Sequence, residues 1–287
     1  MDVSAQAEDM ERVVARAGDL PTMPAVAQKV MQLVADEATT PADLQRVIGS
    51  DPALVSKILR VSNSALFSRV RAITALSQAI LMLGFSTIRS LVIAASVRSM
   101  FRSRTGEYGL KEQLLWEHSL GCGIAARLLA RHLGQEEQEA AFVGGLLHDI
   151  GKVVLNANLA EVYADIFQEA YNEQRPIVAV EMERLGFTHV HVGALVVRRW
   201  NFSAELEDVI ANHHSPEQAQ LDPRGAATIE LADALCRFHG IGARRQEDLD
   251  PAGLPSAALL ELRARDLDQI GARLNQIFQE EKGAFEG

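Results

Sequence analysis

The sequence predicts an all-α fold, on the strength of three observations. Apolar residues recur three and four positions apart, as on one face of a helix, whereas the period-two alternation of strands is scarce. Helix-starting residues such as Thr, Asp and Pro stand before these apolar runs, and glycines follow them. Apolar residues make up 48% of the chain but aromatic residues only 5%. The core therefore relies on Ala, Leu and Val, a mixture that favours helices.

The first helices are predicted between residues 26 and 63. Apolar residues at helical spacing run from Val26 to Val34. Thr40-Pro41-Ala42-Asp43 then offers an N-cap, a proline at the first helical position and a capping-box acid. Gly49 suits the end of that helix, and Asp51-Pro52 starts another. This helix–turn–helix pattern resembles that of DNA readers, but such hairpins are common in all-α proteins, and we do not expect DNA to be the partner.

The later helices follow in the same way. Ser86 can cap a helix that runs to about Met100, and the polar residues 102–109 mark a seam. Beyond the seam we expect a long amphipathic helix at residues 110–134, followed by further helices up to about His239. A polar linker at 242–256 then leads to a last helix at roughly 257–282.

Composition places the protein in a reducing compartment. Its two cysteines, Cys122 and Cys236, have no C-x-x-C spacing, so neither a disulfide framework nor a zinc ribbon is expected. The acidic N-terminus lacks the basic start and apolar run of a signal peptide. The most apolar stretch, Ile73–Met100, is interrupted by a glutamine and two arginines, which indicates buried helices. We therefore expect a cytoplasmic protein without a membrane span.

Charge is segregated along the chain. The net charge is −10, yet the stretch from Pro52 to Gly106 contains no acidic residue. Such segregation predicts an anionic ligand at the 57–104 surface, although these bases would equally fit the rim of a helical surface or contact the acidic remainder of the chain. The eight basic residues are Lys57, Arg60, Arg69, Arg71, Arg89, Arg98, Arg102 and Arg104.

Histidines and aspartates recur in an order that is typical of a metal site. Metal chemistry needs imidazoles and carboxylates that converge from different elements. Asp149 is able to bridge two ions, Gly151 allows the helix to end beside it, and Lys152 lies near enough to touch a phosphate. The candidate ligands are His118, His148, Asp149, His189, His213, His214 and Asp233.

Each candidate also has a structural alternative when it is taken alone. A single histidine such as His118 more often caps a helix or fills a core, and His213-His214 would suit a solvated helix end. We assign no role to His132 and His239, and His191 is interpreted as a surface neighbour of His189. The specificity lies in the ordered set.

This order, His, His-Asp, His, His, Asp, resembles the HD superfamily of metal-dependent phosphohydrolases, and "HDIGK" at 148–152 is similar to its HD-GYP phosphodiesterase branch. From Leu20 to His239 the chain resembles a narrower family, the HDOD domain (HD-related output domain). The matching segments are "LPTMP" at 20–24, "DPALVSKILRVSNSALF" at 51–67, "AILMLGF" at 79–85, "WEHSLGCGIAARLLA" at 116–130, "AFVGGLLHDIGKVVL" at 141–155, "ERLGFTHVHVGALVVRRWNF" at 183–202, "ANHHSP" at 211–216 and "LADAL" at 231–235.

The resemblance implies an N-terminal helical subdomain packed on an HD-like helical bundle. It divides the chain into four parts. Residues 1–18 are a linker or N-terminal helix, and residues 19–105 are the HDOD subdomain. Residues 106–240 are the HD-like subdomain, and residues 241–287 are a linker with a C-terminal helix. It also implies a bacterial signalling module whose partner is a signalling protein such as an upstream receiver or kinase. The implied ligands are His118, His148, Asp149, His189, His213 or His214, and Asp233, for a divalent transition metal (Fe, Mn, Zn or Ni) or Mg.

Departures from the HD-GYP branch argue against assigning cyclic di-GMP hydrolysis. No Gly-Tyr-Pro tract follows Lys152, and Leu114 stands four positions before His118, where that branch can carry a glutamate ligand. The basic N-terminal half has no counterpart there. We therefore predict a regulatory output module that acts through protein contacts, with little catalysis. The alternative is a metal-dependent phosphohydrolase for a nucleotide or cyclic dinucleotide, in which Lys152 would be catalytic by neutralising developing charge.

Overall fold

The computed structural model describes residues 13, 16–64, 66–67, 72–101 and 110–286, and these form helices and loops without a strand. Most of the predicted N-terminal linker, 1–18, and the seam at 102–109 lie outside the described residues. The helices are α2 (Ala25–Ala35), α3 (Pro41–Gly49), α4 (Pro52–Ser62), α5 (Leu76–Val97), α6 (Leu110–His132), α7 (Gln138–Leu147), α8 (Ile150–Asn158), α9 (Ala160–Glu173), α10 (Ile177–Leu185), α11 (His189–Arg199), α12 (Ala204–Asn212), α13 (Pro223–His239), α14 (Pro255–Leu259) and α15 (Ala264–Glu286), with short 3₁₀ turns η1 (Arg98–Phe101), η2 (Pro216–Gln218) and η3 (Pro251–Gly253).

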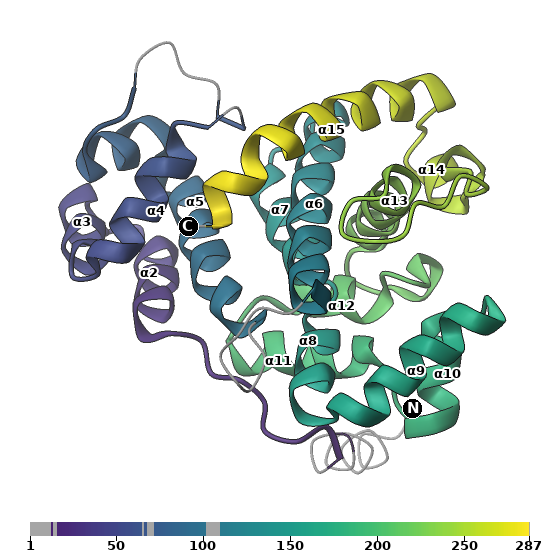
Figure 1. The fold of residues 1–287 in the computed structure, drawn as a ribbon. Helices are drawn as coiled ribbons and strands as arrows, with labels where there is room; N and C mark the ends of the chain where they lie inside the picture. Colours follow the sequence, from purple (N-terminus) through teal and green to yellow (C-terminus); the bar gives the residue numbers. More distant parts are fainter. Residues whose placement is uncertain (1–12, 14–15, 65, 68–71, 102–109, 287) are drawn as a thin grey trace.

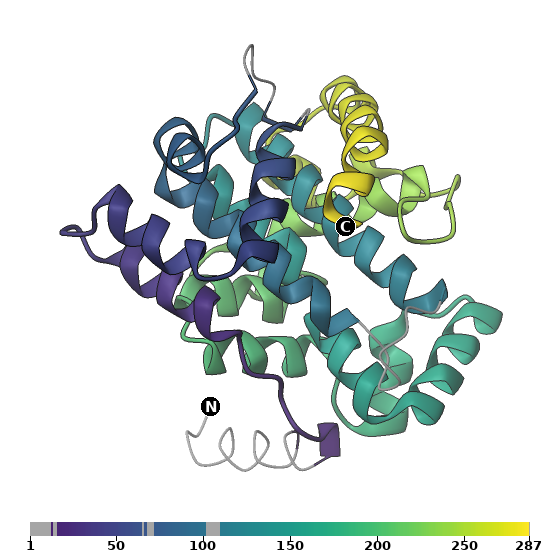
Figure 2. The same ribbon diagram turned by 60° about the vertical axis from the view of Figure 1, so that its left-hand side comes forward.

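The helices form two groups that α5 and α15 join. Helices α2, α3 and α4 gather on one side of the molecule, where they pack on α5 (Figure 1). In the other group, α6 packs against α7 and α13, and α11 packs against α8 and α12. The first group meets the second where α5 contacts α7, and α15 crosses α6 to reach α4 (Figure 2). One hydrophobic core runs through both groups.

The N-terminal helices begin where their capping residues predict. Thr40 accepts a hydrogen bond from the backbone N–H of Asp43, and the Asp43 carboxylate accepts one from the Thr40 backbone, which completes the capping box. Asp51 likewise accepts from the backbone N–H of Leu54 at 3.0 Å. The predicted pair of helices is therefore present. The basic residues predicted to bind an anionic ligand are only partly described, and Arg98 lies over the Trp116 ring.

The helix predicted to start at Ser86 begins ten residues earlier. Helix α5 starts at Leu76 and is broken at Gly84, whose φ of 79° is left-handed and suits glycine alone. Sequence reasoning located the start of the second segment, whereas for the first it predicted only buried helices within Ile73–Met100. Leu76–Phe101 is long and apolar enough to cross a membrane by composition, with a mean hydropathy of 1.9, but half of it is buried within the protein. A core helix of a soluble protein passes the same test, so this feature is weak evidence of a membrane span.

The end of the chain also differs from the prediction. The expected linker at 242–256 contains η3 and the start of α14, because Pro251 and Pro255 each begin a turn of helix. The last helix begins at Ala264 instead of near 257, since Glu261 adopts a left-handed φ of 58° that ends α14. The backbone N–H of Arg263 donates to Asp266 at 3.0 Å, which caps the start of α15.

Candidate metal centre

His148 and Asp149 lie in a break between two helices. Helix α7 ends at Leu147 and α8 begins at Ile150, so the dyad occupies the junction. The prediction that the helix ends here is confirmed, but the role given to Gly151 is wrong, because Gly151 lies inside α8. A Cβ on Gly151 would lie 1.9 Å from the His189 carbonyl oxygen, and one on Gly145 would lie 2.4 Å from the Cys122 carbonyl oxygen. The two glycines therefore bring α8 against α11 and α7 against α6, which places the dyad at the centre.

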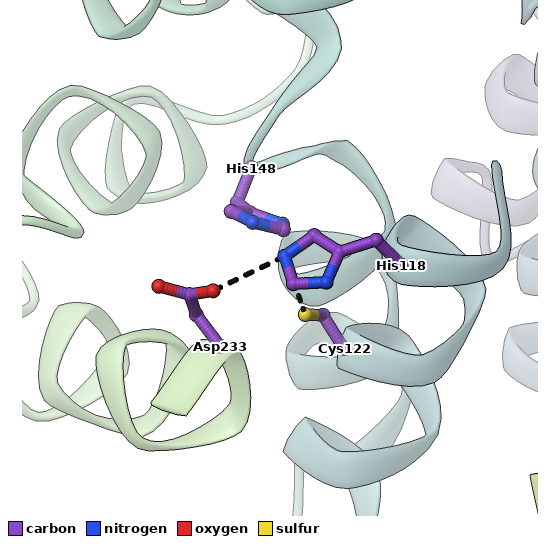
Figure 3. Close-up of side chains that lie close together, drawn as sticks. All are labelled: His118, Cys122, His148 and Asp233. Carbon is purple, nitrogen blue, oxygen red and sulfur yellow. Dashed lines mark hydrogen bonds and ion pairs between the residues drawn. The ribbon is translucent and has the colours of Figure 1, made fainter. Parts of the chain in front are cut away.

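The first donor set, defined as His118, Cys122, His148 and Asp233, brings together side chains from three regions of the chain (Figure 3). One donor atom of each residue lies within 4.8 Å of the others. The His118 Nε2 is 3.1 Å from Asp233 Oδ1 and 3.6 Å from Cys122 Sγ. The Asp149 Oδ2 faces this set, at 3.3 Å from His148 Nε2 and 3.9 Å from His118 Nε2.

The second donor set is defined as Asp149, His189, His213 and His214. Asp149 Oδ1 is 3.3 Å from His189 Nε2 and 3.8 Å from His213 Nε2. The His214 Nε2 lies 3.2 Å from His189 Nε2. Asp149 therefore directs one carboxylate oxygen toward each set, which is the arrangement of a bridging ligand.

Hydrogen bonds to Nδ1 direct Nε2 toward the centre in four histidines. There the His118 Nε2 lies 3.1 Å from the Asp233 carboxylate, whereas the Nε2 atoms of His148 and His213 make no hydrogen bond. A carbonyl or carboxylate oxygen accepts hydrogen bonds, so each partner fixes a proton on Nδ1. These pairs are His118 Nδ1 to Ile241 O at 3.2 Å, His148 Nδ1 to Gly145 O at 2.7 Å, His189 Nδ1 to Glu181 Oε2 at 2.8 Å and His213 Nδ1 to Ile210 O at 2.7 Å.

Three buried atoms at the centre make no hydrogen bond within the part of the chain that the structure describes. They are His148 Nε2, His213 Nε2 and Asp149 Oδ1. Leaving buried polar atoms unsatisfied costs about 1–3 kcal/mol each. These acceptors lie close together, with Asp149 Oδ1 3.8 Å from His213 Nε2 and the His148 and His213 ring centroids 5.0 Å apart, an arrangement that a cation beside them stabilises. The residues present therefore fit a bound divalent metal.

A buried hydrogen-bond chain stands behind His189. Glu181 on α10 is fully buried, and its Oε2 accepts from both the Nδ1 and the backbone N–H of His189. Its Oε1 accepts from the Tyr163 hydroxyl of α9 at 2.5 Å. Burial raises the pKa of Glu181, but the neighbouring His189 imidazole outweighs it, so that the pKa lies below its ordinary value. A carboxylate behind a histidine orients the ring and increases its basicity as a ligand.

The carboxylates of the centre stay ionised. Burial alone would raise the pKa of Asp149, but His148 and Lys152 outweigh burial and hold the pKa well below its ordinary value. Burial alone would also raise the pKa of Asp233. The Arg237 guanidinium, 3.1 Å from Asp233 Oδ2, and His118 outweigh burial and hold this pKa well below that of a free carboxylate. Ionised carboxylates are the form that binds metal.

The pKa of His118 in the first set and the pKa values of His213 and His214 in the second set shift in opposite directions. Burial lowers the pKa of His118, but Cys122 and Asp233 outweigh it, so the pKa lies well above its ordinary value. Burial, assisted by His189, lowers the pKa of His214 from 6.5 to about 3. Burial likewise lowers the pKa of His213 well below its ordinary value. In the metal-free protein His213 and His214 are thus held in the neutral form that ligates metal.

The predicted ligands converge as a group, and Lys152 lies at the edge. Its Nζ is 2.7 Å from Asp149 Oδ2, and its side chain is 13% exposed. Burial lowers the pKa of Lys152, but Asp149 raises it by more, so the ammonium stays charged. Apart from the more exposed His214, the predicted ligands lie in the interior, at exposures of 0–7% for His118, His148, Asp149, His189, His213 and Asp233.

The remaining histidines lie outside the centre, as expected. His191 caps α11 by accepting from the Thr188 backbone, His239 contacts Asn275, and His132 approaches Asp266 at 4.0 Å. Sequence reasoning missed Cys122 and Glu181. The signal for Cys122 was its place one helical turn after His118, on the same face. The sequence around Glu181 holds no comparable signal.

Comparison with known proteins places this chain in a family. The family model for the HDOD domain matches residues 20–216, a range that contains every predicted ligand except Asp233. The fold is similar to an HDOD domain protein of unknown function from Geobacter sulfurreducens, with a TM-score of 0.82 and 22% identity over 99% of this chain and 98% of that one. It is also similar to a candidate phosphohydrolase from Shewanella amazonensis, with a TM-score of 0.75 and 23% identity over 96% and 97%.

Two curated relatives are longer proteins. An uncharacterized protein of Treponema pallidum is 23% identical over 225 residues, which are 78% of this chain and 43% of that protein. Ribonuclease Y of Thermosipho melanesiensis is 27% identical over 218 residues, 76% of this chain and 33% of the enzyme. The chain thus spans less than half the length of these relatives. Because the family model covers most of the chain and the fold agrees with it, this chain belongs to the HDOD domain family.

Proposed function

We propose that this protein is a regulatory output module that holds metal at an HD-type centre and acts through protein contacts, with little turnover. The observation that carries the proposal is a complete set of donor atoms enclosed in the core. Unpaired acceptors of His148, His213 and Asp149 point together, while these three residues are exposed by 2% or less. Metal bound in such a closed site stabilises the fold, whereas a catalytic site keeps a coordination position open to substrate.

We propose that the module makes its protein contacts through helices outside the metal centre, such as α5. Leu81 on α5 is 71% exposed, within the "AILMLGF" segment that is typical of the family. Because a single exposed leucine is ordinary on a protein surface, the partner that we propose, a signalling protein such as a receiver or kinase, rests on the family resemblance. The anionic ligand predicted at the 57–104 surface and the cytoplasmic location likewise stay predictions.

A second candidate function is metal-dependent phosphoester hydrolysis. One observation favours it: Lys152 and His214, at the more open edge of the centre, would face a substrate phosphate. A bound metal would supply Lewis acidity and an activated water. Lys152 would neutralise charge on the phosphate, while Asp149 keeps the ammonium in place at 2.7 Å. The similarity to ribonuclease Y and to candidate phosphohydrolases suggests RNA and phosphodiesters as substrates to test.

Metal analysis together with a hydrolysis assay separates the two candidates. We expect the protein, purified anaerobically with Mn or Fe supplied, to contain near-stoichiometric metal and to leave bis(p-nitrophenyl) phosphate, cyclic di-GMP and single-stranded RNA intact. Metal-dependent hydrolysis that is lost in Asp149→Ala would overturn the output-module proposal in favour of the hydrolase. The matched control is Glu117→Ala, because Glu117 precedes His118 on α6 but bonds to Gln113. A protein that takes up no metal would contradict both functions.

A further inference from the structure

Cys122 is a buried thiol at the centre that the HD ligand pattern does not include. It follows His118 by one turn of α6, so both side chains lie on the same helix face. The side chain is 0% exposed, and its sulfur points toward the His118 ring in Figure 3. The chain holds Cys122 there firmly, because the adjacent α7 crosses α6 at the Cys122 carbonyl, where only Gly145 fits.

The spacing of the donor atoms matches a shared metal. Ligand bonds of about 2.0–2.3 Å at tetrahedral angles place neighbouring donors roughly 3.3–3.6 Å apart. The Cys122 sulfur is 3.6 Å from His118 Nε2, and Asp233 Oδ1 is 3.1 Å from the same nitrogen. All four donors of the first set lie within 4.8 Å of one another. The separations of His118 from Cys122 and from Asp233 therefore stand close to the spacing that one ion requires.

The structure assigns Cys122 as a thiolate ligand of the metal in the first donor set, an inference that rests on the proposed metal centre. Two imidazoles, one carboxylate and one thiolate then surround the ion. Thiolate and imidazole ligands suit zinc and ferrous iron, whereas Mg and Mn prefer oxygen donors. The first set thus takes a zinc-type metal, with Co(II) as a spectroscopic substitute, and disfavours Mg.

The assignment also explains why the first set would not turn over substrate. Structural zinc sites use four protein ligands, whereas catalytic sites use three and leave one position for water. With Cys122 included, the first set supplies four donors, and Asp149 Oδ2 adds another within 3.3 Å of His148 Nε2. The second set lacks a sulfur donor. The two sets are therefore expected to differ in the metal that each prefers.

Co(II) spectroscopy tests the thiolate directly. Chelator-treated, reduced protein is loaded anaerobically with Co(II), and its near-ultraviolet spectrum is compared among wild type, Cys122→Ala, Cys122→Ser and Cys236→Ala. Cys236 is the matched control, because it is buried on α13 against Cys122 but belongs to neither donor set. We expect a thiolate-to-Co(II) charge-transfer band in the wild type and in Cys236→Ala, and its loss in both Cys122 variants.

Metal affinity provides the second measurement. In competition with a chromophoric chelator, Cys122→Ala should lose more Zn²⁺ affinity than the roughly 10–100-fold that an outer-shell substitution costs, and its Mn²⁺ affinity should change by less. Co(II) bound to the wild type without the band would overturn the inference and leave the metal centre standing. So would a band that persists in Cys122→Ala. If the wild type bound none of these metals, the inference and the proposed function would both fall. The wild-type spectrum decides the question even if Cys122→Ala does not fold.

Discussion

The first and second donor sets flank Asp149, which directs one carboxylate oxygen toward each, but they rest on different surroundings. The first set has a neutral carbonyl, that of Ile241, behind His118, and Arg237 beside Asp233. The second set has a buried anion, Glu181, behind His189. An anion behind a ligand makes the imidazole a better donor, whereas a carbonyl orients the ring with less charge. The contrast predicts that the two sets respond differently to the same kind of substitution.

The sets also differ in how their histidines titrate. His118 faces Cys122 and Asp233, which raise its pKa. When metal is absent, a proton on His118 therefore stabilises the first set. His213 and His214 face other imidazoles from a buried position, which lowers their pKa values. Because His213 and His214 stay neutral, the second set is suited to bind a metal cation. Three changes, taken from the largest expected effect to the smallest, test this contrast.

The largest effect is expected for Asp149→Ala, because Asp149 lies between the sets and directs one carboxylate oxygen toward each. The variant should lose metal from both sets and, when metal-free, about 3 kcal/mol of unfolding free energy, because Lys152 is left charged and largely buried. Metal analysis and urea unfolding measure the two losses. The double variant Asp149→Ala/Lys152→Met should regain most of the stability but none of the metal. If Asp149→Ala removed metal from one set alone, the bridging role would be wrong.

An intermediate effect is expected for Glu181→Gln, which acts on the second set alone. The amide removes the negative charge behind His189, so metal affinity of that set should fall by roughly 10–100-fold, while the Co(II) spectrum of the first set stays unchanged. Tyr163→Phe, which removes only the hydroxyl donor to Glu181, should have a smaller effect in the same direction. Titration with Co(II), followed by absorption, measures both. An equal loss of affinity in the two sets would remove the distinction between them.

Most of the fold could be predicted from the sequence, and so could the candidate ligands that the structure brings together, because both depend on local or ordered patterns. Thr40 and Asp51 cap their helices by contacts within three residues, and the histidines and aspartates of the centre follow the family order. Contacts between distant helices had no such pattern. Gly151 looks like a helix end in the sequence, and only the approach of His189 explains it. Glu181 stands beside exposed Met182, and nothing local distinguishes it as buried.

The smallest effect is a pH dependence of opposite sign in the two sets of the metal-free protein. His214 titrates near 6.5 when unfolded and at about 3 when folded. Its contribution to stability is therefore complete above pH 6.5 and declines as pH falls toward 3, by about 1.4 kcal/mol per pH unit. For His118 the folded pKa is the higher one, so its contribution is complete below pH 6.5 and is lost as pH rises through the folded pKa.

Urea unfolding in the presence of a chelator, at pH 7.5 and 5.5, measures these slopes. Relative to wild type, His214→Gln should lose less stability on acidification, by about 1.4 kcal/mol, because only the wild-type unfolded chain gains a proton at this position. His118→Gln should change the slope the other way, since it removes a group whose folded form holds its proton more tightly. If both variants shifted the slope in the same direction, the electrostatic contrast between the sets would be wrong, even if both sets bound metal. The sign of the change in this pH slope of the unfolding free energy is a stricter test than its size. Any loss of packing changes the unfolding free energy, but only a folded-state pKa shift sets the sign of its pH dependence.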